Sequence, residues 1–223
     1  MLNSPVIFIK DLIENLPLIL SSLVNTLQLA TVVTITGLLG GIVILYFSLS
    51  QYSFVRKLAA SYISFFIGTP LLVILFLIYY GLPQYGFGPS AFTVAVICFT
   101  LNVSAYNAAY LNSAYRGLDP NELAAAKSQG FSDFQIYRLI TLPQVLRTSI
   151  PALTNQVIAN LKDTAIVFLI GYTDFFARMQ SLAADDFQFF NAYLFTAIVY
   201  IMMVSLIVIA ARWIERHIKP KIL

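Results

Sequence analysis

Charged residues are scarce in this sequence. Only 10% of its 223 residues are Asp, Glu, Lys or Arg, whereas 59% are hydrophobic and the mean hydropathy is +0.82. Ordinary soluble domains carry roughly 25% charged residues, so the composition excludes that class. The apolar runs are long enough to cross a bilayer as helices, and the sequence therefore predicts an all-α membrane protein.

Cysteine and histidine are almost absent as well. The one cysteine, Cys98, lies in an apolar run, which excludes a disulfide or a cysteine-based metal cluster and favours a small core residue. The one histidine, His217, lies in a basic tail with no second ligand nearby. A phosphate loop of the form G-x-x-x-x-G-K-[ST] is also missing. We therefore expect no catalytic residue, no metal site, no cofactor bound by this chain and no nucleic-acid partner.

Three long segments carry no charge, and a fourth carries little. A transmembrane helix needs about 20 mostly apolar residues, and these segments accommodate five helices. Gly37, Gly40 and Gly41 give the first of them a small-residue face on which another helix can pack closely. The predicted spans lie at about residues 18–47, 58–80, 91–111, 150–170 and 192–211, within a single transmembrane domain that covers residues 1–223.

Thr69 and Pro70 lie inside the second predicted span. A proline within a helix leaves a backbone carbonyl without its donor and kinks the helix. Two interpretations stay open at this point: a kink that serves only packing, and a kink with a role in gating.

The distribution of Lys and Arg predicts the orientation of the spans. If the N-terminus lies outside and the C-terminus in the cytoplasm, ten of the thirteen Lys and Arg residues lie on the cytoplasmic side, as the positive-inside rule requires. They are Arg56, Lys57, Arg116, Lys127, Arg138, Arg147, Arg212, Arg216, Lys219 and Lys221. The opposite orientation would place all ten outside, so we exclude it. The polar loop at residues 112–149 is therefore predicted to be cytoplasmic.

This loop is long enough to fold by itself. Residues 121–129 are rich in alanine and other helix formers, and Gly130 follows at a natural helix C′ position. Ser132 precedes Gln135 by three residues, which is the spacing of a capping box at the start of a second short helix. Pro143 is predicted to end that second helix.

The first helix of the loop has an unusually small side-chain surface. Ala124, Ala125 and Ala126 leave it a slim face that is able to enter a groove on a soluble partner. Pro151, after the loop, suits the first turn of the fourth span. We therefore interpret the loop as a docking element.

The loop resembles the cytoplasmic motif of ABC-importer permeases, written EAA, three residues, G, nine residues, I-x-LP. The matching residues are Ala125, Ala126, Gly130, Ile140, Leu142 and Pro143. Other stretches are similar to the polar amino acid uptake branch of that family. They are GTPLLVILFLIYYGLP at 68–83, AY at 105–106, LPQVLR at 142–147, LKDT at 161–164 and IG at 170–171.

The resemblance implies a type I ABC importer permease fold in a multi-pass protein of the bacterial inner membrane. Two permease subunits would form the translocation pathway, and each would dock its loop into an ATPase subunit that uses ATP and Mg²⁺. A binding protein outside the membrane would deliver an amino acid, whose identity stays open, and membrane lipid would surround the spans. This chain would then be a transport subunit and not an enzyme.

Three charged positions of the family pattern are apolar in this chain. The Glu of EAA aligns with Ala124, the usual Arg before G-T-P is Ile67, and the usual Glu four residues after the alanine of AY is Ala109. A second, non-identical permease that keeps those charges would compensate for their loss. We therefore hypothesise an asymmetric pair of permeases.

The altered motif also predicts how docking responds to substitution. Glu122 lies two residues before Ala124, about 200° around the helix, and is a poor substitute for the missing acid. We expect Glu122→Ala to do little, whereas Gly130→Asp or a bulky residue at Ala125 should uncouple transport.

Polar residues in the fourth span are candidates for the translocation pathway. Lys162 and Asp163 fall near the middle of the bilayer, where ionisable groups are costly and by default functional. A role in the pathway or its gating and a role as a structural polar clamp both stay open. Asn155 and Asn160 either contact substrate or bridge helices.

Two other classes of protein compete with the importer permease. An ion-coupled secondary transporter subunit would usually show internal repeats and about twice as many spans in one chain, and this sequence shows no repeat. A membrane scaffold protein would not need charges at mid-bilayer. The sequence therefore favours the importer permease, with the ion-coupled transporter as the alternative.

Overall fold

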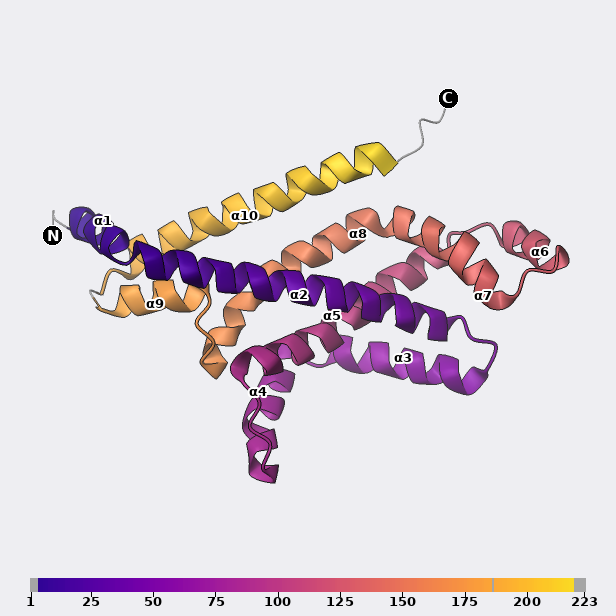
Figure 1. Ribbon diagram of the computed structural model, residues 1–223, viewed down its shortest axis with the longest axis horizontal. Coiled ribbons are helices and arrows are strands. Elements are labelled where there is room, and N and C mark those ends of the chain that lie inside the picture. The colour runs from indigo at the N-terminus through magenta and orange to yellow at the C-terminus, as the bar shows by residue number, and fades with distance from the viewer. Residues whose placement is uncertain (1–3, 186, 219–223) are drawn as a thin grey trace. The chain divides into compact units, whose positions relative to one another are not determined.

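The computed structural model describes residues 4–185 and 187–218, so Lys219 and Lys221 of the basic tail lie outside it. Figure 1 labels its α-helices α1 to α10, and three short helices, η1 to η3, lie between them along the chain. They are α1 (Ser4–Glu14), α2 (Leu16–Ser48), α3 (Ser53–Gly68), α4 (Leu71–Gly81), η1 (Leu82–Tyr85), α5 (Ala91–Tyr115), α6 (Pro120–Ser128), α7 (Asp133–Ile136), η2 (Tyr137–Thr141), α8 (Leu142–Asp163), η3 (Thr164–Ile170), α9 (Phe175–Asp185) and α10 (Phe189–Ile218). Within the described residues the fold is entirely helical, as predicted.

Three helices of the described chain, α2, α5 and α10, are long and apolar enough to cross a membrane, and the bent pair formed by α3 with α4 and η1 is a fourth if it counts as one span. These helices contain the predicted spans at 18–47, 91–111 and 192–211. The predicted span at 150–170 is not among them; it corresponds to the end of α8, which runs to Asp163, and to the 3₁₀-helix η3 that follows directly.

Pro70 breaks the second predicted span into two helices. The residue before a proline is driven out of the helical region, and Thr69 is extended, with φ −102° and ψ 128°. The amide of Thr69 still donates to the carbonyl of Phe65 as the last bond of α3. The helix then begins again at Leu71, after the residue that has no N–H to donate.

The contacts divide the chain into two compact units. Unit 1 holds residues 1–33, 72–98 and 157–207, and unit 2 holds residues 34–71, 99–156 and 208–223. The long helices α2, α5, α8 and α10 each contribute residues to both units.

Unit 1 has a core in which α9 packs with parts of α2, α8 and α10. Leu161, Phe175 and Met179 are fully buried there. Side chains of α2 hold the segment before α9, since the buried Thr26 Oγ1 accepts a hydrogen bond from the Phe175 amide at 2.9 Å. Asn25 Nδ2 donates to the Thr173 carbonyl at 2.9 Å.

Unit 2 is built on close packing of α2 against α5. The glycine face predicted from the sequence lies at this contact: a Cβ atom added at Gly40 would come within 2.7 Å of Ser104, and one at Gly41 within 2.6 Å of Asn107. Only glycine allows the two backbones to approach so closely. Beyond this contact Leu45 and Leu111 form a second core, which also receives residues from the chain between α5 and α8.

Candidate functional site: the loop between α5 and α8

The first helix of the α5–α8 loop (residues 116–141) has a defined beginning and end. The side chain of Asp119 caps α6 by accepting a hydrogen bond from the Asn121 amide, and Pro120 occupies the first helical position. At the other end Gly130 has φ +87°, and the Phe131 amide donates to the Ala126 carbonyl at 3.2 Å. This is a Schellman termination, and it confirms the predicted helix end at Gly130.

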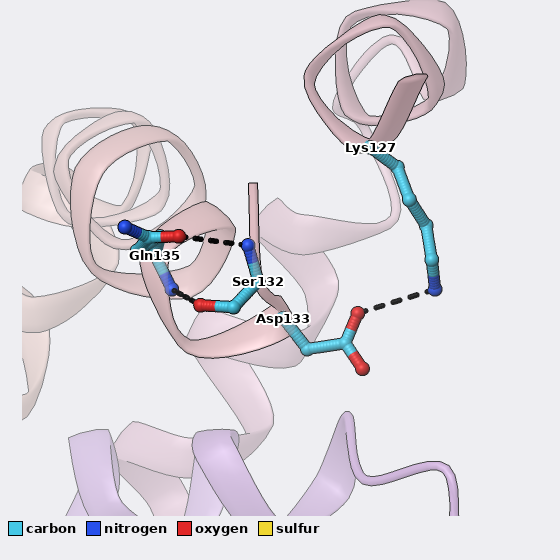
Figure 2. A network of polar contacts seen from close by, with 4 residues as sticks. All are labelled: Lys127, Ser132, Asp133 and Gln135. Atoms are coloured by element: carbon cyan, nitrogen blue, oxygen red, sulfur yellow. Dashed lines mark hydrogen bonds and ion pairs between the residues drawn. The ribbon is translucent and has the colours of Figure 1, made fainter. Parts of the chain in front are cut away.

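The second helix begins with the predicted capping box. Ser132 Oγ accepts from the Gln135 amide at 3.3 Å, and Gln135 Oε1 accepts from the Ser132 amide at 2.8 Å. Figure 2 shows these two reciprocal bonds, and beside them the exposed ion pair of Lys127 with Asp133 at 3.2 Å. Local side-chain bonds therefore shape the whole turn between α6 and α7.

The predicted end of the second helix at Pro143 is wrong. The chain passes from α7 through the π-helix η2 and directly into α8. The amide of Leu142 donates to the Tyr137 carbonyl five residues back. This wider π-helical turn lets the chain stay helical at Pro143, which has no N–H to donate. Because α8 already begins at Leu142, Pro151 lies inside this helix and not at the first turn of the fourth span.

Tyr137 anchors this half of the loop in the core of unit 2. Its hydroxyl donates to the Ile42 carbonyl of α2 at 2.7 Å, and its ring lies edge-on to Tyr46 with centroids 5.0 Å apart. Burial, with Tyr46 beside it, raises the pKa of Tyr137 to about 12. The phenol therefore keeps its proton and remains a donor at any physiological pH.

Some motif residues pack against the rest of the chain, and others are exposed to solvent. Ala126 is buried, and Leu142 packs against the core of unit 2, whereas Ala124 and Ala125 are exposed. The other motif residues are half-buried or exposed: Ile140, Gly130 and Pro143. The slim face expected of the first helix is thus presented by two of its three alanines.

Two features of the loop have no signal in the sequence pattern. Gln144 Nε2 donates to Glu122 Oε2 at 2.9 Å, across a sequence separation of 22 residues. A groove of about 610 Å³ lies between the loop and the chain that joins α2 to α3, and Ala124 lines it together with Tyr46, Tyr52 and Tyr137. Neither contact follows from local spacing, because each joins segments that only the fold brings together.

The pathway candidates belong to both units. Lys162 and Asp163 are exposed in the last turn of α8, directly before η3. In unit 1, Asn160 is buried and its Nδ2 donates to the Ala30 carbonyl of α2 at 3.1 Å. In unit 2, Asn155 is exposed.

The break at Thr69 and Pro70 lies in unit 2. Thr69 is half-buried and Pro70 is exposed, both at the end of α3. Among the described residues, no three His, Cys, Asp or Glu side chains are grouped so that they could hold a metal ion.

Comparison with known proteins places the chain among transport proteins. A family model described as "binding-protein-dependent transport system inner membrane component" matches residues 37–223. The chain is 36% identical over 207 residues to the probable amino-acid ABC transporter permease protein PatM of Vibrio harveyi, covering 92% of this chain and 93% of PatM. It is 30% identical over 208 residues to the arginine transport system permease protein ArtQ of Bacillus subtilis, covering 93% and 95%.

Chains of two solved transporter structures are also similar to this chain. One chain in a crystal structure of an amino acid ABC transporter with histidines is 33% identical and superimposes with a TM-score of 0.83, covering 93% of this chain and 97% of that one. A chain of the MetNI methionine ABC transporter in an inward-facing conformation is 17% identical with a TM-score of 0.74, covering 92% and 97%. At that identity the second likeness shows the fold alone.

Proposed function

We propose, from the premise that this chain belongs to the family of binding-protein-dependent transport system inner membrane components, that it is the membrane-spanning permease subunit of an ATP-driven amino acid importer. One observation carries this function: the motif-bearing loop forms two capped helices that leave Ala124 and Ala125 exposed. The relatives are importer permeases, which favours this function over the ion-coupled alternative.

The proposed topology has five spans in a bacterial inner membrane, with the N-terminus outside and the C-terminus in the cytoplasm. Spans one, three and five correspond to α2, α5 and α10, and span two to the bent pair of α3 and α4. The fourth span consists of α8 and η3. The Lys and Arg distribution supports this orientation, and lipid covers the apolar surfaces that α2 and α10 expose.

The proposed partner of the loop is an ATPase subunit. Helix α6 carries Glu122 in its first turn and Lys127 in its last turn, each favourable to the helix dipole. Its exposed alanines permit close approach of a groove on the partner, so docking here rests on shape and backbone groups more than on the acid that Ala124 lacks. The ATPase consumes ATP and Mg²⁺, and an external binding protein delivers the amino acid.

The end of α8 supports a second permease subunit. Lys162 and Asp163 are exposed on this chain, and charges that face lipid are strongly disfavoured. A partner permease, or a water-filled pathway between two permeases, would surround them. Because Ala124, Ile67 and Ala109 lack the family's charges, we propose a non-identical partner.

Reconstitution tests the function. The chain, co-purified with its ATPase and second permease, is placed in proteoliposomes with the binding protein, and labelled amino acids are tested in competition. We expect uptake that requires ATP and the binding protein, and a loss of more than tenfold for Ala125→Trp. Ala125→Ser is the matched control, because it leaves the exposed face small. Uptake driven by an ion gradient without ATP would overturn the proposal.

Purification of the tagged chain with its membrane partners tests the asymmetric pair. Two different permease species in a functional complex are the expected result. A functional transporter with this chain as its single permease species would contradict the asymmetry while leaving the importer function intact.

A further inference from the structure

We propose that the hydrogen bond between Glu122 and Gln144 is a tether that sets the position of helix α6, which makes both side chains positioning residues for coupling to the ATPase. This inference rests on the proposed function and changes one expectation drawn from the sequence. Glu122 lies outside the motif register, and its substitution was expected to have little effect. The structure gives it a partner on the first turn of α8.

Helix α6 needs such a tether because packing holds it weakly. Ala126 is its one buried residue among those described, and Leu123 is half-buried. A single buried methyl group stabilises a helix position only slightly. A side-chain bond from α6 to another helix therefore has a large share in holding it.

The side-chain bonds at the two ends of α6 differ in what they constrain. Lys127 and Asp133 are six residues apart, and the glycine turn and capping box between them already fix that segment. Both side chains are exposed, so their ion pair adds little. The bond between Glu122 and Gln144 spans 22 residues and closes a large loop. It alone of the two joins α6 to α8.

The far end of the tether is fixed in the core of unit 2. Gln144 is half-buried and precedes Val145, which is fully buried against Leu45 and Leu111. Glu122 is exposed, so its carboxylate can follow α6 if the helix moves and can release Gln144. The tether thus connects α6, which has few buried contacts, to α8, which is held in the core of unit 2. A single hydrogen bond of this kind is directional but contributes only modestly to stability.

Six variants of the complex test the tether, with amino acid transported per ATP hydrolysed as the readout. Glu122→Ala and Gln144→Ala remove the bond, and we expect each to lower this ratio about three- to tenfold, with no further loss when combined. Glu122→Gln keeps an acceptor and should stay within about twofold of wild type. Gln144→Glu opposes two carboxylates and should lose the most. The exchange Glu122→Gln with Gln144→Glu restores donor and acceptor and should recover the ratio.

A distance measurement separates the tether from the proposed function. Spin labels at Ser128→Cys on α6 and Arg147→Cys on α8 occupy exposed positions, and Cys98 is buried. We expect a narrow distance distribution in the wild type and the exchanged pair, and a broad one in both alanine variants, whether or not uptake is measured. Absence of ATP-dependent uptake in the wild type would contradict the function and leave this distance result standing.

Three results would overturn the tether. The first is wild-type coupling and a narrow distribution in both alanine variants. The second is additive losses in the double alanine variant. The third is equal loss in Glu122→Ala and Glu122→Gln with a silent Gln144→Ala, which would mean that the Glu122 charge contacts the ATPase directly.

Discussion

Polar groups have different surroundings in two regions of the chain: the α5–α8 loop, and the segment from the end of α8 to α9. In the loop, Asp119, Ser132 and Tyr137 each bond to another group of the same chain. At the end of α8, Lys162 and Asp163 are exposed, although an apolar run at residues 165–170 follows them closely. The loop therefore satisfies these polar groups within the chain, whereas the end of α8 leaves two charged side chains exposed.

The same contrast extends into the turn before α9. Asp174 is fully buried, and its Oδ1 caps α9 by accepting from the Ala177 amide at 2.8 Å. Its Oδ2 is also buried and accepts no hydrogen bond from the described residues. Buried polar groups are nearly always satisfied, so this segment carries a free-energy penalty that the loop avoids.

Loss of the charge at Lys162 should have the largest effect. If Lys162 serves the pathway, Lys162→Met will abolish uptake while the complex still assembles, because an ionisable group at this depth is retained for function. Uptake and the yield of purified complex are measured together. Lys127→Met in the exposed ion pair of the loop is the control and should be nearly silent. Normal uptake with normal assembly for Lys162→Met would favour the structural clamp.

Removal of the Tyr137 ring should be the most damaging change within the loop. Tyr137→Ala deletes a buried ring and its bond to the Ile42 carbonyl, and we expect a loss of about 3–5 kcal/mol in the free energy of unfolding. Tyr137→Phe removes only the hydroxyl and should cost about 1 kcal/mol. Thermal unfolding in detergent gives both values. Equal stability of the alanine variant and the wild type would show that the loop is not anchored here.

The buried Asp174 side chain predicts that stability depends on pH through the segment before α9, and not through the loop. Burial raises its pKa to about 6, above the value of about 3.9 expected in the unfolded chain. The stability that protonation provides is therefore fully present below about pH 4 and is lost as the pH rises through about 6.

Asp174→Asn keeps the capping oxygen and removes this titration. We expect it to be more stable than the wild type at pH 8 by on the order of 2–3 kcal/mol and about equal near pH 4. Unfolding in detergent at both pH values measures the difference. A difference that does not change with pH would contradict a buried, titrating carboxyl group at this position.

Substitution of Gly130 should have the smallest effect on stability and sharpens the role of the loop. Gly130 has φ +87°, and a Cβ atom added there would meet nothing within 4 Å. Gly130→Val should cost about 1–2 kcal/mol of stability through backbone strain alone. Gly130→Asp should cost less stability, because Asp tolerates this region better, so the uncoupling expected of Gly130→Asp would not come from lost stability.

The coupling ratio and the amount of co-purified ATPase report these effects. Gly130→Asn is the matched control, because asparagine adopts the left-handed region most readily, and it should stay close to the wild type. Equal damage from Asn and Val would mean that the partner needs the empty space at Gly130, and not its backbone conformation.

The sequence alone determined those features whose causes are local. The end of α6 at Gly130 and the capping box of Ser132 with Gln135 depend on bonds between residues a few positions apart, so their residue types and spacing predict them. The long apolar helices α2, α5 and α10 follow from composition, because about 20 apolar residues without charge suit a membrane span. The family resemblance depends on the same kind of short, ordered spacing.

Only the tertiary structure decided how these pieces are joined. The bond from Tyr137 to Ile42 crosses 95 residues, and that from Gln144 to Glu122 crosses 22. Pro143 lies within a continuous helical path and Pro70 breaks one, although both remove a donor. The neighbouring turns differ. Before Pro143 the π-helix η2 gives the Leu142 amide an acceptor in the Tyr137 carbonyl, whereas before Pro70 the helix α3 ends. Such outcomes depend on packing and hydrogen bonding between distant segments, which no local pattern contains.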